Sequence, residues 1–275
     1  FNTIRMTSIS GSAKELESRN IEDFNLLPVE KIPKWTRQEY KSFPVSLLKV
    51  YGLVVNVKDK LTRKAIYNCL NIDNFRKIYF PKDKMPVDVA SIFPIGIEGA
   101  SPGKIKQICN NESFLKTKRA LTLANWKPEV EKELESVFKD LFKSTNIQVT
   151  VKNYDASVLG DLLLKKQSGY DLMVVALDST NEEYLPFFES FLEPSKRFHT
   201  VDLSRLKSDY LDLKKADTKQ KIVSIAQKLN TELLDEAVFV PILQQTREYF
   251  FPKDLKELNL GSNFLGYLEI GNIRL

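Results

Sequence analysis

The segment between residues 118 and 178 constrains the fold most, because two apolar periods take turns along it. Polar and apolar residues alternate in Lys118–Ala124 and again in Ile147–Val151, as in half-buried strands, and Leu172–Leu177 is a continuous apolar run. Between these stretches, the apolar residues that follow Pro128 and those around Leu159 have helical spacing. This order predicts a βαβαβ unit.

The carboxyl ends of the strands in such a unit are where ligands bind. The last predicted strand ends at Asp178, and the polar run Ser179–Glu183 follows it. We therefore expect a site near Asp178.

Composition indicates an ordinary globular chain without a nucleic-acid surface. Its 275 residues allow one large domain or two small ones, and 43% of them are hydrophobic. The net charge of +5 is spread along the chain rather than clustered, so a polyanion site is disfavoured. No run of about 18 apolar residues suggests a membrane span.

The motifs of common enzymes are missing. Neither phosphate-binding glycine pattern occurs, and Asn125–Pro128, the turn after the first predicted strand, contains no glycine. His199 is the sole histidine, which excludes His-rich zinc sites, and no nucleophile-elbow motif accompanies it. We expect no catalytic residues, no metal and no cofactor.

Cys69 and Cys109 are the only cysteines, and they fit either one disulfide or two buried thiols. Cys69 belongs to the apolar face of a predicted helix, which favours buried thiols.

Flanking elements follow from the same signals. Asp59 and Asp73 are the expected N-caps of two helices, the second running through Phe75 to Tyr79. Prolines, Pro44 among them, break regular structure before residue 51. The other expected elements are strands at Tyr51–Val57 and Ala237–Leu243, a loop at Pro81–Gly103, and helices at Pro186–Glu193 and Thr218–Asp235.

Four stretches, in this order, resemble the C-terminal part of the extracellular solute-binding proteins of ABC importers for oligopeptides, dipeptides and nickel. Each is similar to one loose motif of that family: a strand ending in Asn and its helix, the continuation "a-i-d-r-x-x-i", the strand "g-d-y-D-l…D", and a late helix with the strand "a-p-x-i-P-l". The stretches are Tyr51–Ile66, Leu70–Phe75, Gly169–Asp178 and Asp217–Ile242.

The resemblance implies an α/β fold: a class II periplasmic-binding-protein-like lobe with a mixed sheet flanked by helices, plus an incomplete portion of the other lobe. Residues 1–50 would be a remnant of the first lobe, residues 51–243 the ligand-binding lobe, and residues 244–275 a return segment. Family members are roughly twice as long, and the chain lacks an initiator Met, so we expect a piece of a longer protein.

The resemblance also implies site residues. Asp178 matches the position that pairs with the α-ammonium of a peptide ligand in peptide-binding members. Val174–Leu177 stands where the family often has Gly-Trp, and Val175, Ala176 and Leu177 are expected ligand contacts. Asp178 could equally cap the turn that follows it. Gln244 is a further expected ligand contact, and Asn56 and Gln245 are the expected hinge residues.

The implied function is that of a binding protein, not an enzyme. It would capture a small peptide or similar solute between two lobes that close about a hinge, and deliver it to a membrane permease. Its expected partners are the solute, the permease and the missing N-terminal lobe, and its expected location is periplasmic or extracellular. Three alternatives stay open: a sensory lobe of a cytoplasmic transcription regulator, a small α/β hydrolase or transferase built on His199, and a surface interaction protein that has lost its ligand.

Overall fold

The structure is a computed structural model that describes residues 27–28, 40–81, 86–109, 119–143, 147–155, 158–159, 169–179, 183–252, 257–258 and 273–274. The chain forms two compact units: Leu47–Gln245, and Phe1–Ser46 together with Thr246–Leu275. This division falls near the boundaries expected from the sequence, whose assignment to lobes stays a prediction. Most of the expected first-lobe remnant (residues 1–50), of the return segment (residues 244–275) and of the helix expected around Leu159 lies outside the described residues.

A six-stranded mixed sheet organises the described strands, in the order β1-β6-β2-β5-β3-β4. β3 pairs in parallel with β4 and β5, whereas β2 pairs antiparallel with β5. The strands are β1 (Leu27–Pro28), β2 (Tyr40–Val55), β3 (Arg119–Asn125), β4 (Ile147–Asn153), β5 (Leu172–Asp178) and β6 (Phe239–Pro252). Two short strands, β7 (Glu257–Leu258) and β8 (Ile273–Arg274), form a separate pair.

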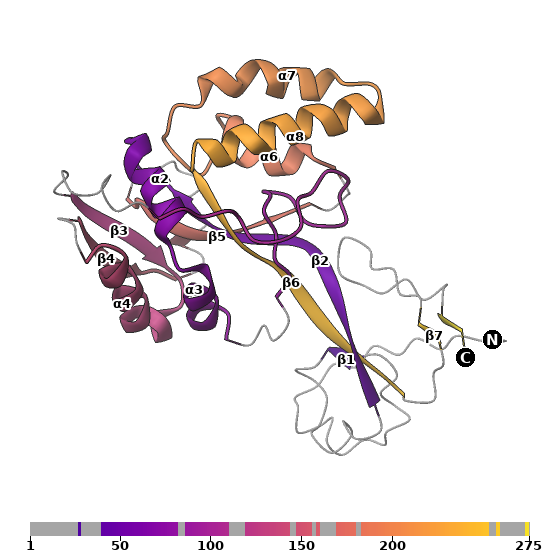
Figure 1. Ribbon diagram of the computed structural model, residues 1–275, viewed down its shortest axis with the longest axis horizontal. Helices are drawn as coiled ribbons and strands as arrows, with labels where there is room; N and C mark the ends of the chain where they lie inside the picture. The colour runs from indigo at the N-terminus through magenta and orange to yellow at the C-terminus, as the bar shows by residue number, and fades with distance from the viewer. Residues whose placement is uncertain are drawn as a thin grey trace. The chain divides into compact units, whose positions relative to one another are not determined.

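Helices cover both faces of the sheet in the larger unit (Figure 1). One apolar cluster joins the sheet to α6 (Leu185–Leu192), α7 (Lys207–Lys215) and α8 (Lys219–Asp235). The other joins it to α2 (Lys60–Cys69), α3 (Ile72–Tyr79) and α4 (Glu131–Leu141). Short 3₁₀ turns, η5 (Pro128–Val130) and η6 (Ser204–Leu206), precede α4 and α7. The expected α/β architecture with a mixed, helix-flanked sheet is confirmed.

The alternation of β5 explains how one strand serves both layers. Met173, Val175 and Leu177 belong to the cluster under α6–α8, whereas Leu172 and Val174 belong to the cluster under α2–α4. Successive side chains of a strand point to opposite faces, so a central strand covered on both sides is apolar throughout. None of the described helices is long and apolar enough to cross a membrane.

The helix caps agree with the sequence in one case and differ in another. Asp59 accepts a hydrogen bond from the Thr62 N–H and caps α2, as predicted. The predicted cap of α3 is wrong: Asn71 accepts from the Asn74 N–H at 3.0 Å, and Asp73 lies in the first turn. There its carboxylate accepts a hydrogen bond from Lys104, and its negative charge stabilises the N-terminus of the helix through the helix dipole.

Two further expectations are corrected. β2 begins at Tyr40, not Tyr51, so Pro44 lies within a strand instead of breaking one. Proline has the φ of an extended chain, so a strand tolerates it where no ladder hydrogen bond is donated. Cys69 and Cys109 are not separate buried thiols but form a disulfide with a Cα–Cα distance of 4.6 Å. Cys69 is the last residue of α2, only half-buried, and residues 104–109 run back to it.

Gly52 in β2 is required by close packing. A Cβ atom at this position would lie 2.1 Å from Cζ of the fully buried Phe239 ring, which belongs to the neighbouring strand β6. Any side chain at this position would displace that ring, so glycine allows the Phe239 ring to pack directly on the backbone of β2.

Candidate functional site

Asp178 lies at the carboxyl end of β5, as predicted, and the structure gives it a partner that the sequence did not indicate. The antiparallel register places Lys49 of β2 directly opposite Asp178. The Lys49 Nζ lies 3.1 Å from the Asp178 carboxylate, and 62% of the Asp178 side chain is exposed. The strand end therefore presents a charge pair, a lysine and a carboxylate side by side, to solvent.

The side chain of Asp178 faces the α2–α4 side of the sheet. Alternation along β5 groups it with Leu172 and Val174, which are core residues of that side. The neighbouring register pair, Tyr51 and Ala176, has the same orientation, and the Tyr51 ring contacts Phe80 with centroids 4.8 Å apart.

Two of the three residues expected beside Asp178 are core residues. Val175 and Leu177 are 7% and 2% exposed and pack under α6–α8, whereas Ala176 is half-buried. The side chains of Val175 and Leu177 are therefore not available to a ligand, although their backbone lies next to the strand end.

Gln244 is a structural residue in this fold. Its side chain is fully buried, its carbonyl accepts from the Ile95 N–H at 2.8 Å, and its amide donates to the carbonyls of Leu47 and Ile95 at 2.9 Å. Because these bonds occupy both ends of the amide, a ligand could bind it only by displacing one of them.

The two expected hinge residues differ in position. Gln245 lies at the boundary between the compact units, whereas Asn56 lies well inside the larger one. The buried Asn56 amide donates to the Tyr170 carbonyl, and its oxygen accepts from the N–H and hydroxyl of Thr200. Asn56 thus fastens the end of β2 and the segment just before β5 to the loop at Thr200, and its role in a hinge remains a prediction.

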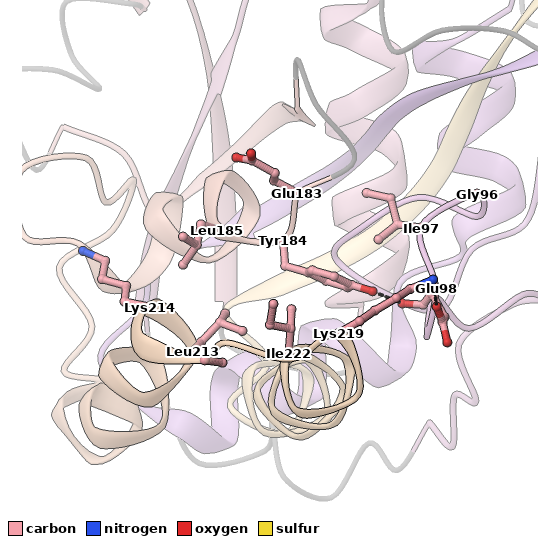
Figure 2. A pocket seen from close by; sticks show the side chains of 11 residues that line it. Gly96, Ile97, Glu98, Glu183, Tyr184, Leu185, Leu213, Lys214, Lys219 and Ile222 are labelled. Carbon is pink, nitrogen blue, oxygen red and sulfur yellow. Dashed lines mark hydrogen bonds and ion pairs between the residues drawn. The ribbon is translucent and has the colours of Figure 1, made fainter.

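A cavity of about 850 Å³ lies elsewhere in the larger unit, and the sequence did not indicate it. Figure 2 shows its lining: the ring of Tyr184 beside aliphatic side chains that come from α6, α7, α8 and the loop before Ala100. The apolar contributors are Ile97, Tyr184, Leu185, Leu213, Ala216 and Ile222. All of these except Ala216 pack with the α6–α8 cluster, so the cavity and the Asp178 side chain are on opposite faces of the sheet.

Tyr184 forms a fixed wall of this cavity. Its hydroxyl donates to the Glu98 carbonyl at 2.7 Å, and its ring contacts Phe93 edge-on with centroids 5.5 Å apart. Burial raises the pKa of the Tyr184 hydroxyl, which stays protonated and keeps donating at neutral pH. The loop at Gly96–Gly99 is therefore attached to the start of α6.

One ion pair stands at the edge of the cavity. Lys219 Nζ lies 2.7 Å from the Glu98 carboxylate, and these side chains are 83% and 57% exposed (Figure 2). The other lining lysine, Lys214, binds Glu193 at 2.8 Å. Exposed pairs of this kind contribute about 0–1 kcal/mol, so the Glu98–Lys219 pair separates at little cost.

His199 has none of the contacts of a catalytic base. It is 3% exposed and stacks on Phe191, and neither ring nitrogen has a hydrogen-bond partner of acceptable geometry in the described part of the chain. Burial, with the nearby Arg197 charge, lowers the pKa of His199 to about 4. The hydrolase alternative therefore finds no support at this residue. Among the described residues, no group of three His, Cys, Asp or Glu is placed to hold a metal ion.

What the sequence missed depends on long-range pairing. Lys49 meets Asp178 only through the β2–β5 register, and Ile97, Tyr184 and Ile222 come together from segments far apart in the chain. The sequence held two local signals near these sites: the polar run after Asp178 and the apolar stripe of α8. Neither signal specifies which distant residues lie next to Asp178 or next to Ile222.

No protein-family model and no curated protein matches the sequence of the chain. Solved structures do match its fold. An ABC transporter substrate-binding protein from Sinorhizobium meliloti has a TM-score of 0.71 at 12% identity over 97% of this chain and 60% of its own. A dipeptide binding protein from Pseudoalteromonas sp. SM9913, in complex with Met-Leu, has a TM-score of 0.63 at 10% identity. That match covers 84% of this chain and 49% of the dipeptide binding protein. NikA from Staphylococcus aureus, in complex with Ni(L-His)2, has a TM-score of 0.62 at 17% identity, and the match covers 92% of this chain and 57% of NikA.

These matches confirm the expected resemblance at the level of fold: the chain folds like the substrate-binding proteins of ABC transporters. The chain spans about half the length of the structures that it matches.

Proposed function

We propose that this chain is part of a substrate-binding component of an ABC import system, which captures a small peptide or similar solute and delivers it to a membrane permease. The observation that carries the proposal is the fold, shared over 97% of the chain with an ABC transporter substrate-binding protein. In proteins with that fold the work is binding and release rather than turnover, so we propose a binding protein and not an enzyme.

Peptides are the solute class with the most support. One structure with this fold is a dipeptide binding protein in complex with Met-Leu, and another is a murein tripeptide binding protein. We propose that Asp178 accepts hydrogen bonds from the ligand ammonium at the strand end, and that Lys49 beside it donates to a ligand carboxylate. Such charge-assisted hydrogen bonds are about twice as strong as neutral ones.

A periplasmic or extracellular location belongs to the same proposal. The Cys69–Cys109 disulfide supports it, because disulfides persist in oxidising compartments and are rare in the cytosol. The disulfide counts equally against a regulator that works in the cytoplasm.

Titration calorimetry of the intact protein, in which this chain is joined to its expected N-terminal lobe, with a library of dipeptides and tripeptides tests the function. We expect saturable binding of free peptides and binding about tenfold weaker, or weaker still, for the same peptides with an acetylated amine, since a lost charged hydrogen bond costs about 1.5–3 kcal/mol. The absence of binding across the library would reject peptide capture by this chain.

The place of the ammonium is tested by Asp178→Asn. This change keeps the shape of the side chain and removes the charge, so the advantage of free over acetylated peptides should fall about tenfold. Asp140→Asn, which neutralises an exposed carboxylate on α4, serves as the control and should leave the advantage unchanged. Equal behaviour of the two variants would remove Asp178 from the site.

A further inference from the structure

We infer that the cavity between α6, α7 and α8 is a second solute site, which binds a zwitterionic amino acid or dipeptide with a large apolar side chain. The inference uses only contacts within Leu47–Gln245 and does not depend on the proposed function. It concerns a face of the sheet different from that of Asp178.

The interior of the cavity favours an apolar group. Ile97 and Leu213 are each 4% exposed, and Leu185 and Ile222 are half-buried beside the Tyr184 ring. The hydrogen bond from Tyr184 to the Glu98 carbonyl and the contact with Phe93 hold this lining in place without a ligand. A volume of about 850 Å³ is within the usual range of small-molecule sites and exceeds the needs of a single side chain.

The edge of the cavity selects a ligand with both charges. Glu98 and Lys219 are paired with each other, and their exposure makes the pair weak. A ligand with only one charge would separate this ion pair and replace only one side of it. A zwitterionic amino acid or dipeptide brings an ammonium for Glu98 and a carboxylate for Lys219, so it exchanges one ion pair for two.

Two half-buried isoleucines of α8 provide a matched pair of variants. Ile222 lines the cavity, whereas Ile225, one turn later, packs against the same core without lining it. Lys219 is so exposed that its replacement by Met should not disturb folding.

The experiment is titration calorimetry in an Asp178→Asn background, which weakens binding at the strand end and leaves the cavity unchanged. Leucyl-leucine should bind at least tenfold more tightly than glycyl-glycine. Ile222→Ala should weaken leucyl-leucine at least fivefold, and Ile225→Ala less than twofold. Leucyl-leucine methyl ester, which lacks the carboxylate, should bind at least fivefold more weakly than the free dipeptide, and Lys219→Met should remove that difference.

Any of three results would overturn the inference. One is that Asp178→Asn abolishes all dipeptide binding, which places the only solute site at the strand end and leaves the proposed function standing. The second is that Ile222→Ala and Ile225→Ala weaken binding equally, and the third is that Lys219→Met still discriminates the ester. If Ile222→Ala proves unfolded by circular dichroism, the ester comparison in Lys219→Met decides alone.

Discussion

At the scale of single residues, His199 makes the stability of the fold depend on pH. The side chain is buried without a hydrogen-bond partner of acceptable geometry among the described residues, and burial lowers its pKa to about 4. The unfolded chain binds a proton near pH 6.5, its ordinary value, whereas the folded chain does so only near pH 4. Acid therefore favours the unfolded state, and the stability present above pH 6.5 is lost as the pH falls towards 4.

Urea unfolding at pH 7 and pH 5 measures this effect. The wild-type chain should lose about 2 kcal/mol more of its free energy of unfolding over this interval than His199→Phe, which cannot titrate. Carboxylates contribute equally to both proteins, so the difference isolates the histidine. A wild-type loss no greater than that of His199→Phe would show that His199 titrates normally in the fold.

At the scale of elements, a buried arginine fastens the start of α2 to the end of α8. Arg63 is 2% exposed and donates to the side chain and carbonyl of Glu236, and to the carbonyls of Val57 and Lys58. Lys64, the next residue, binds Asp235 at 2.8 Å, but these side chains are 42% and 54% exposed. The two neighbours make the same kind of connection in different surroundings.

Arg63→Met should lower the free energy of unfolding by about 3–5 kcal/mol, because it leaves buried carbonyls and part of the Glu236 carboxylate without their donor. Lys64→Met is the control and should cost less than about 1 kcal/mol. Chemical denaturation of both variants at pH 7 checks this prediction. Similar losses in the two variants would mean that burial does not distinguish these ion pairs.

The elements themselves could be predicted where one period dominates a segment. The helix Thr218–Asp235 was expected from its apolar stripe, and α8 occupies Lys219–Asp235. The strand–helix order was equally clear because polar and apolar residues alternate in the segments of β3 and β4, and β5 is a continuous apolar run. The early part of β2 was missed because Pro44 is a breaker in isolation, and only pairing with other strands keeps the segment extended. For the same reason Lys49 and the cavity lining could not be foreseen, since register and helix packing bring them together.

At the scale of the whole molecule, the disulfide links segments that are 40 residues apart. Closing a loop of this size reduces the entropy of the unfolded chain, which corresponds to about 4 kcal/mol of stability. Dithiothreitol should therefore lower the urea midpoint of the wild-type chain markedly. The double variant Cys69→Ser with Cys109→Ser should start near the reduced wild type and not respond to dithiothreitol. An unchanged midpoint after reduction would show that the link adds nothing.

The buried Gln244 has a consequence for how this unit responds to force. Its side chain accepts from the N–H of Ile95 and donates to the carbonyls of Ile95 and Leu47, while its backbone exchanges two hydrogen bonds with Val87. Ile97, a wall of the cavity, lies two residues beyond Ile95. The segment that carries Ile97 is therefore not a freely moving loop. A force on it is resisted by the hydrogen bonds of Gln244, which also connect to Leu47 in β2, at the border of the larger unit.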